Sequence, residues 1–298
     1  MVIGALVLTT AVSDGACPSR TSYATLRYEE DYSFLRDPSC RTDPWDGFKY
    51  VPLDLDGDVY LSTGGDARVK YEYLRNFRWG QPPEDHDGYV LQRLLVHGDL
   101  HVARYARAFV QLESSLEEGR KGGPRPVDED KLDVNQAFLD AVAPLDGGRS
   151  LTLRVGRQEL AYGAQRLVSV RELPNVRRTF DALRLIWMMP ELRIDGFVSH
   201  PVEPHIGVFD DRSNGPRSFW GAHAVTGSPF AGQPDGSLLL GAYQRPGALR
   251  SRTCIRGSAY DRRSSLRASW RLGLRPRADV SVGDVRARRH SRVGRGIG

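Results

Sequence analysis

The segment from Arg154 to Leu185, RVGRQELAYGAQRLVSVRELPNVRRTFDALRL, carries seven arginines and no lysine. A guanidinium group keeps its charge at any working pH, and its planar fork of N–H donors matches a carboxylate or a phosphate. The segment therefore indicates either contact with an anionic partner or a loop that merely faces water. The choice depends on the elements that position these arginines.

Other residues of the chain have types suited to metal binding or catalysis. HGDLHV puts His97, Asp99 and His101 on one face of a strand, about 7 Å between alternate residues, and DLDGD from Asp54 resembles the start of a calcium loop. The twelfth position of that loop is Gly65, where a bidentate glutamate is needed, so a turn fits better. The sequence has no nucleophile elbow and no phosphate loop. We expect no cofactor, no metal site and no catalytic residue, and therefore no enzyme.

Period-two alternation of apolar and polar residues dominates the chain from Gly64 onward. It predicts eight strands and the start of a ninth at about 64–75, 89–102, 106–115, 132–142, 149–158, 180–189, 191–199, 217–226 and 237–243. Long and short connections alternate between them. This alternation is typical of an outer-membrane barrel, with short turns at its periplasmic end and long loops outside.

The two faces of the predicted strands differ sharply. One face is almost free of charge and includes Leu151, Leu153, Val155, Leu183, Leu185 and Trp187. The other carries charges of both signs, and we expect the following residues to line a wet lumen: Arg68, Lys70, Arg93, Arg107, Arg154, Arg157, Arg184, Arg193, Glu72, Asp99, Glu113, Asp140 and Asp195. Oppositely charged neighbours that simply neutralise one another across strands would give the same pattern. Tyr73, Tyr89, Trp187 and Trp220 fall near strand ends, where interfacial aromatic residues are expected.

The number of cations on the polar face bears on the width of the barrel. A barrel of eight or nine strands has an interior barely wide enough for its own side chains. Burying so many cationic groups there would cost more free energy than incomplete pairing returns. A wider, water-filled barrel is easier to form, so we expect this chain to hold only part of the strands, as an incomplete open sheet.

Charge is distributed unevenly along the chain. Residues 245–298 contain 15 Arg and 3 Asp, without Lys or Glu, while the other 244 residues contain 27 basic and 34 acidic side chains. The pI near 9.2 therefore describes the tail and not the body. An arginine-only tail without sustained alternation favours translation out of frame after about residue 244 over a nucleic-acid-binding arm.

The first residues have the pattern of an export signal. Val2 to Val12 is apolar and too short to span a membrane as a helix, which suits the remnant of a signal peptide over residues 1–20. Residues 21–62 are predicted as an N-terminal periplasmic segment and residues 63–243 as a partial barrel. Cys17 and Cys40 could pair in an oxidising compartment, although their spacing alone does not establish this.

Several stretches, in the same order, resemble the alginate-export outer-membrane proteins. They are YVPLDLDGDVYLSTGGDARVKYEYLRN, LQRLLVHGDLHV, ARAFVQLESS, VNQAFLDA, LRVGRQELAYGAQRLVSVRELPNVRRTFDALRL and SFWGAHAV, within about residues 45–243. The resemblance implies a monomeric barrel of about 18 strands in the Gram-negative outer membrane, with an arginine-rich lumen that passes an anionic polysaccharide such as alginate. The chain departs from that pattern by ending after about half of the strands.

These inferences lead to one expected function with named alternatives. We expect an outer-membrane channel for an alginate-like polysaccharide or small anionic solutes, in contact with outer-membrane lipid and with periplasmic export machinery, and without nucleic acid. The alternatives are a soluble β-sandwich that binds carbohydrate and a polysaccharide-active enzyme. A sandwich would cover the face with Leu151, Leu153 and Val155, whereas a barrel leaves that face open to lipid.

Overall fold

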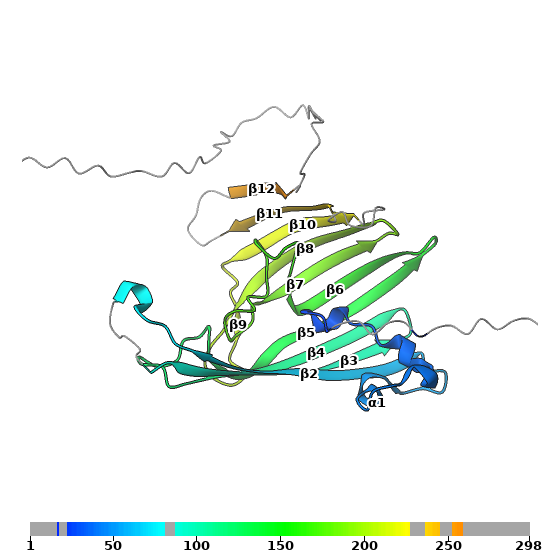
Figure 1. The fold of residues 1–298 in the computed structure, drawn as a ribbon. Helices are drawn as coiled ribbons and strands as arrows, with labels where there is room; N and C mark the ends of the chain where they lie inside the picture. Colours follow the sequence, from blue (N-terminus) through cyan, green and yellow to red (C-terminus); the bar gives the residue numbers. More distant parts are fainter. Residues whose placement is uncertain (1–16, 18–22, 81–86, 227–235, 245–251, 259–298) are drawn as a thin grey trace, which may run out of the picture. The chain divides into compact units, whose positions relative to one another are not determined.

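The computed structural model describes Cys17 and residues 23–80, 87–226, 236–244 and 252–258. The chain forms one antiparallel sheet in which strands follow one another in sequence order, and the two-residue strand β9 pairs with β8 alone (Figure 1). The strands are β1 Val51–Pro52, β2 Val59–Glu72, β3 Tyr89–Val102, β4 Ala106–Glu118, β5 Asp130–Leu145, β6 Arg149–Glu159, β7 Thr179–Met188, β8 Leu192–Glu203, β9 Arg212–Ser213, β10 Ser218–Thr226, β11 Gly236–Gln244 and β12 Arg252–Ser258. The helices are short: η1 Arg27–Glu29, η2 Ser33–Arg36, η3 Pro38–Cys40, α1 Asp46–Lys49 and η4 Phe77–Gly80.

The predicted fold class is confirmed, because the sheet is antiparallel, up-and-down and open. All nine predicted strands are present, with ends that shift by up to five residues, the largest shift being the start of β2 at Val59. A further strand, β12, pairs with β11 beyond the predicted end of the sheet. Its sequence has little alternation, but pairing at a sheet edge uses backbone groups that every residue carries. The remaining residues of the arginine-rich tail, and all of residues 1–20 except Cys17, lie outside the described part of the chain.

The connections alternate in length as the sequence predicts. Three-residue turns at 103–105, 146–148 and 189–191 join β3 to β4, β5 to β6 and β7 to β8. The intervening connections are longer and span 73–88, 119–129, 160–178 and 204–217. We call the two ends of the sheet the short-turn end and the long-loop end. Within the described residues, no helix is long and apolar enough to cross a membrane.

The outer face of the sheet is apolar and uncovered. Val69 is 76% exposed and Leu139 is 65% exposed, and on β7 the side chains of Leu183, Leu185 and Trp187 are 44%, 48% and 42% exposed. Within the described part of the chain no second sheet covers these residues, which excludes the sandwich alternative for this region. The residues that a sandwich would bury are the ones that a membrane barrel turns toward lipid.

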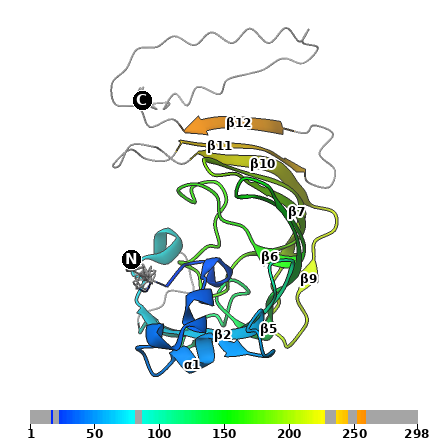
Figure 2. The ribbon, with the colours of Figure 1, turned by 90° about the vertical axis from the view of Figure 1, so that its right-hand side faces the viewer.

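The concave face of the sheet is covered by two other segments of the chain. Residues 23–50 lie inside the curve (Figure 2), where Tyr28 packs edge-on against Phe109 of β4 and Phe138 of β5. The loop 160–178 contributes Val170, which is fully buried in the same cluster. A disulfide joins Cys17 to Cys40 and confirms the pairing that the sequence left open. Both segments therefore occupy space that the sequence assigned to a wet lumen.

The prediction that Tyr89 is an interfacial aromatic residue is wrong. Tyr89 is only 2% exposed, and its ring lies 3.7 Å from the guanidinium carbon of Arg120. Tyr89 begins β3 on the concave side, so its position at a strand end did not place it at a membrane surface. Tyr73, Trp187 and Trp220 are exposed at 51%, 42% and 47%.

Candidate functional site

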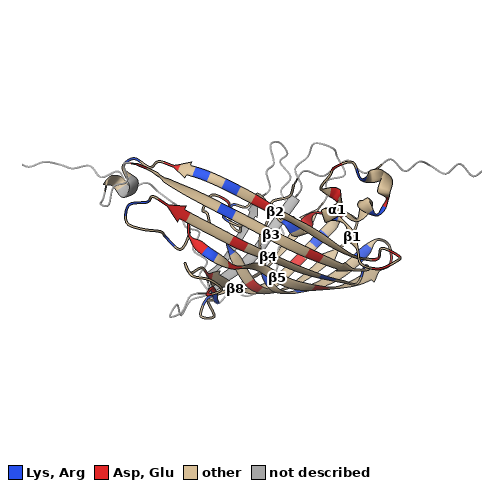
Figure 3. Cartoon of the chain, turned by 90° about the horizontal axis from the view of Figure 1, so that it is seen from below, with Lys and Arg blue, Asp and Glu red and all other residues tan. Residues whose placement is uncertain are grey.

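The candidate site is the charged concave face of the sheet, where residues from neighbouring strands meet side by side. Basic and acidic residues recur along β2 to β5 and are mixed in sign (Figure 3). Strand alternation brings one side chain in two to this face, and antiparallel register sets which partners lie opposite. Asp140 faces Arg154 in this register, and Arg154 faces Arg184 on the next strand.

Arg154 and Asp140 form a buried two-point ion pair. The Nε and Nη2 atoms of Arg154 each donate to one carboxylate oxygen of Asp140 at 2.7 Å. The guanidinium carbon also lies 3.9 Å from the Phe138 ring centre and 4.3 Å from that of Tyr28. The two charged residues are 4% and 6% exposed. Arg154 is therefore held between an acid and two aromatic rings, beneath the N-terminal segment.

Arg184 shares an acid with Arg193. The Nη2 atom of Arg184 donates to Asp195 at 2.7 Å, and the Nε atom of Arg193 donates to the other oxygen of Asp195 at 3.0 Å. Arg184 is 2% exposed, whereas the side chain of Arg193 retains 32% exposure. Within this pair of arginines, only Arg193 is open to a solute.

A third acid on this face is engaged near the short-turn end. Asp99 accepts from Nε of Arg107 at 2.7 Å, and His101 Nε2 lies 3.1 Å from the same carboxylate. The His101 ring stacks on Tyr60, while His97 stacks on Phe109. Asp99 and His101 of HGDLHV thus contact each other, whereas His97 packs separately against Phe109.

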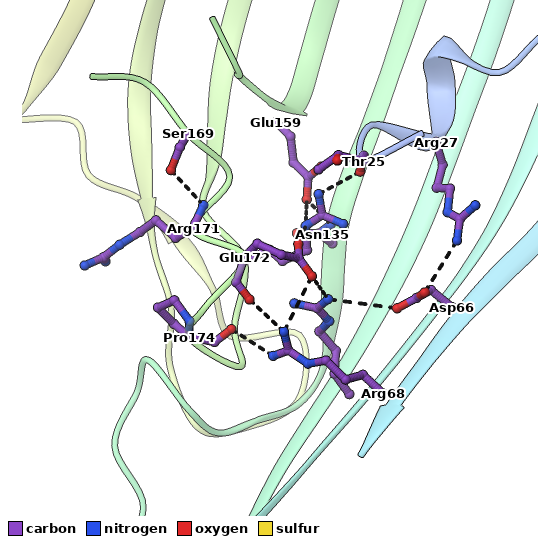
Figure 4. Close-up of polar contacts among 12 residues, drawn as sticks. Thr25, Arg27, Asp66, Arg68, Asn135, Glu159, Ser169, Arg171, Glu172 and Pro174 are labelled. Carbon is purple, nitrogen blue, oxygen red and sulfur yellow. Dashed lines mark hydrogen bonds and ion pairs between the residues drawn. The ribbon is translucent and has the colours of Figure 1, made fainter. Parts of the chain in front are cut away.

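The loop 160–178 crosses the concave face and is bound at its far side. Arg68 donates to the backbone oxygen of Glu172 at 2.6 Å and to that of Pro174 at 3.0 Å (Figure 4). Lys70 donates to Leu173 O at 2.8 Å. The carboxylate of Glu172 also accepts a hydrogen bond from the guanidinium group of Arg93. A loop that begins after β6 is therefore fastened to β2 and β3 by three of the predicted lumen cations.

Electrostatics favour the charged state of the acid at this crossing. Partial burial opposes ionisation of Glu172, but the hydrogen bond from Arg93 and the charges of Arg177, Arg93 and Arg68 outweigh it and lower the pKa of Glu172. Asn175 adds backbone contacts beside it, because its side-chain amide donates to Gln92 O at 2.8 Å and to Asp128 O at 3.0 Å. Ion pairs of Glu172 and hydrogen bonds from Asn175 to backbone carbonyls therefore both hold the loop in place.

A pair of fully buried acids lies beneath this loop. Glu159 pairs with Nε of Arg177 at 2.8 Å and accepts from Asn135 at 3.0 Å. Glu113 accepts from Ser115 at 2.7 Å and from the backbone N–H of Arg177 at 3.2 Å. Glu113 was expected to line the lumen, and its carboxylate instead lies under the loop.

One predicted lumen residue lies on a different side of its strand. Arg157 is three residues from Arg154, so strand alternation turns it away from the concave face and toward the side of Leu153 and Val155. Its Nε atom donates across to Asp181 of β7 at 3.0 Å. The expectation that Arg157 lines the lumen is therefore corrected. The sequence already contained the signal, because Arg154 and Arg157 in RVGR are an odd number of residues apart.

The predicted lumen residues form ion pairs but differ in the solvent exposure of their side chains. Side-chain exposure is 23% for Arg68 and 27% for Lys70, and Lys70 also pairs with Glu72 at 2.6 Å. A separate pocket of about 760 Å³ at the long-loop end is lined by residues that include Arg171, Arg178, Arg217 and His205. The accessible cations thus lie on β2, on β8 and at the long-loop end, not at Arg154 and Arg184.

Sequence reasoning missed the residues whose role depends on how loops fold. Glu172, Asn175 and Arg177 lie in the long connection between the predicted strands 149–158 and 180–189, and the sequence indicated no partner for them. It also missed a group of three acids at the long-loop end, Asp130, Asp133 and Asp211. The acidic runs DED and FDD were visible in two long connections, but nothing in the sequence indicated that these connections meet.

Comparison with known proteins agrees with the geometry. The family model described as "Alginate export" matches residues 59–225, which covers β2 to β10 apart from the last residue of β10. Neither the curated proteins nor the solved structures gave a match. The family is one of export proteins of the outer-membrane β-barrel type and not a family of enzymes. An uncovered apolar outer face, a charged concave face and alternating loop lengths accompany a match over more than half of the chain, and this chain belongs to the alginate export family.

Proposed function

We propose that the protein contributes the wall of an outer-membrane channel through which an anionic polysaccharide passes along the concave face. Membership in an export family supports outer-membrane passage of polysaccharide in general. The observation that carries the anionic cargo is the set of accessible cations on the concave side, Arg68, Lys70 and Arg193. A uronate polymer bears one carboxylate per sugar, which guanidinium and ammonium groups attract.

The ion pairs on the concave face suit passage better than tight binding. A conduit must release its cargo, so attraction should be spread over several weak sites. Acids beside the cations reduce the attraction at each site, as Asp195 does beside Arg193.

The pocket at the long-loop end supplies a second group of cations. It is lined by Arg171 and Arg217 together with the apolar ring of Phe219. Sugar rings present both apolar faces and charged substituents, so this combination suits a uronate residue. We infer that the polymer meets this pocket outside the region that the loop 160–178 crosses. Small anionic solutes would follow the same cations.

The test is ion selectivity in planar bilayers. The protein in Gram-negative outer-membrane lipid should form pores whose reversal potential in a KCl gradient shows a preference for anions. Arg68→Gln with Lys70→Gln removes two accessible charges but keeps amide donors for the loop carbonyls, so the preference should fall. Short uronate oligomers should block the unaltered pore more strongly than the variant.

The matched control removes a basic group away from the concave face. Arg149 is exposed at the short-turn end, on the same side of β6 as Leu151 and Leu153, so Arg149→Gln should leave selectivity and block unchanged. Equal selectivity in all three proteins would contradict the proposal. A preference for cations in the unaltered protein would do so as well.

A further inference from the structure

Three carboxylates, two from the start of β5 and one from a long connection, meet at the long-loop end of the sheet. Asp130 and Asp133 stand at the start of β5, and Asp211 lies in the connection 204–217. Each can offer one oxygen such that the three oxygens lie within 4.8 Å of one another. Like charges at this separation repel, so an arrangement of this kind requires compensation.

The backbone holds the two connections together at this point. Phe209 N donates to Leu132 O at 2.9 Å, and Lys131 N lies 3.4 Å from Ile206 O. The backbone N–H of Asp211 donates to the carboxylate of Asp133 at 3.0 Å. Residues 206–211 therefore run alongside the first residues of β5, and the position of the three acids follows from main-chain contacts.

The surroundings of the Asp130 carboxylate indicate a bound ligand. Asp130 is 2% exposed, and its Oδ1 atom has no hydrogen-bond partner. A buried carboxylate without a partner costs several kcal/mol unless a proton or a cation neutralises it. Arg157 lies beside the cluster, with its Nη1 atom 3.5 Å from Asp133. Within the described residues no ion pair joins Asp130 or Asp211 to a basic side chain.

We propose that Asp130, Asp133 and Asp211 form a binding site for a calcium ion that fastens the connection 204–217 to the start of β5. An all-oxygen donor set selects hard cations. The three oxygens all lie within 4.8 Å of one another, which is close enough for one hard cation to contact all three.

The place of the site also fits calcium. Long loops of an outer-membrane barrel face the outside, where calcium is far more abundant than in the cytosol. Sites of this kind bind with a Kd of about 10⁻⁴ to 10⁻³ M. The ion would order a loop that contributes Arg217 and His205 to the pocket described above.

The first experiment is calorimetric titration of the folded, EDTA-treated full chain with CaCl₂. We expect one ion per chain, and we expect Asp130→Asn and Asp211→Asn each to remove the binding heat. Asp211 lies in a connection and is partly exposed, so Asp211→Asn remains informative if Asp130→Asn does not fold. Heat-modifiable migration in gels identifies the folded variants.

The control is a second acidic pair. Asp54 and Asp56 are exposed in DLDGD, and Asp54→Asn with Asp56→Asn should leave calcium binding unchanged. Trypsin cleavage after the exposed Arg212 and Arg217 gives an independent readout, which EDTA should accelerate in the unaltered protein and leave unchanged in Asp211→Asn. No binding heat in the unaltered protein, loss of binding in the control pair, or tighter binding of magnesium than of calcium would overturn the proposal.

Discussion

Charged side chains on the concave face form ion pairs. Removing one partner of a buried pair should lower the free energy of unfolding. Arg154→Met leaves Asp140 without its guanidinium at 6% exposure, so we expect a loss of about 3 to 5 kcal/mol in unfolding free energy. Urea unfolding in lipid vesicles measures this loss. Arg149→Met, at an exposed turn, should change the free energy by less than about 1 kcal/mol. Similar losses for both variants would show that the Arg154 pair is not specifically stabilising.

The charge of Glu172 gives the loop 160–178 a dependence on pH. Because the pKa of Glu172 is lowered in the folded protein, its contribution is fully present above the ordinary glutamate pKa of about 4.3 and is lost as pH falls through the lowered value. We expect protease cleavage within the loop to accelerate below about pH 4 in the unaltered protein. Glu172→Gln should show fast cleavage already at neutral pH. A cleavage rate that is equal in both proteins at neutral pH would contradict this role.

At this scale the sequence predicts which residues are polar and on which face most of them lie, but not whether they are accessible. Alternation placed Arg154 and Arg184 correctly on one side of the sheet. Their burial depends on Tyr28 and on the loop 160–178, whose paths have no period that could be recognised. The pairing of Arg68 with a residue about a hundred positions away had no local signal for the same reason.

Among the elements, the contact of β5 with β6 depends on one glycine. Gly156 has φ of +132°, and a Cβ there would lie 2.2 Å from Ala137 O and 2.8 Å from the Phe138 Cα. Gly156→Ala should therefore force β5 and β6 apart beneath Phe138 and destabilise the fold by more than about 1 kcal/mol. Gly196→Ala in β8 is the matched control, because open space surrounds that position.

Thermal unfolding of the two glycine variants, followed by heat-modifiable migration, separates these effects. Gly156→Ala should unfold at a lower temperature than the unaltered protein, and Gly196→Ala should not. The same midpoint for both variants would mean that the strand contact tolerates a side chain at position 156.

Strands were predictable as elements, whereas the packing of the connections was not. Alternation gave the order and type of nine strands, β2 to β8, β10 and β11, because each of these strands has one apolar and one polar face. The strand β12 lacked that signal and pairs through its backbone. The two acidic runs that meet at Asp130 and Asp211 belong to connections, where spacing does not indicate tertiary contact.

For the whole molecule, the proposed channel requires that the outer face of the sheet meets lipid. The outer face is uncovered and apolar, while the concave face carries the ion pairs and is covered by the chain itself. A charged residue on the lipid face near the bilayer centre costs about 2 to 4 kcal/mol in unfolding free energy. Leu185→Arg should therefore prevent or weaken insertion into vesicles, and Leu185→Ala should not. Equal insertion of the two variants would argue against lipid contact at β7.

The most direct test is the accessibility of single spin labels along β2 in lipid vesicles, with Cys254 replaced by Ser and the native disulfide kept. Labels at Ala67, Val69 and Tyr71 should collide mainly with oxygen dissolved in lipid. Labels at Arg68 and Lys70 should collide mainly with a water-soluble nickel complex, giving a period of two. Uniform contact with the nickel complex at all five positions would contradict a lipid-facing outer surface and, with it, the proposed channel.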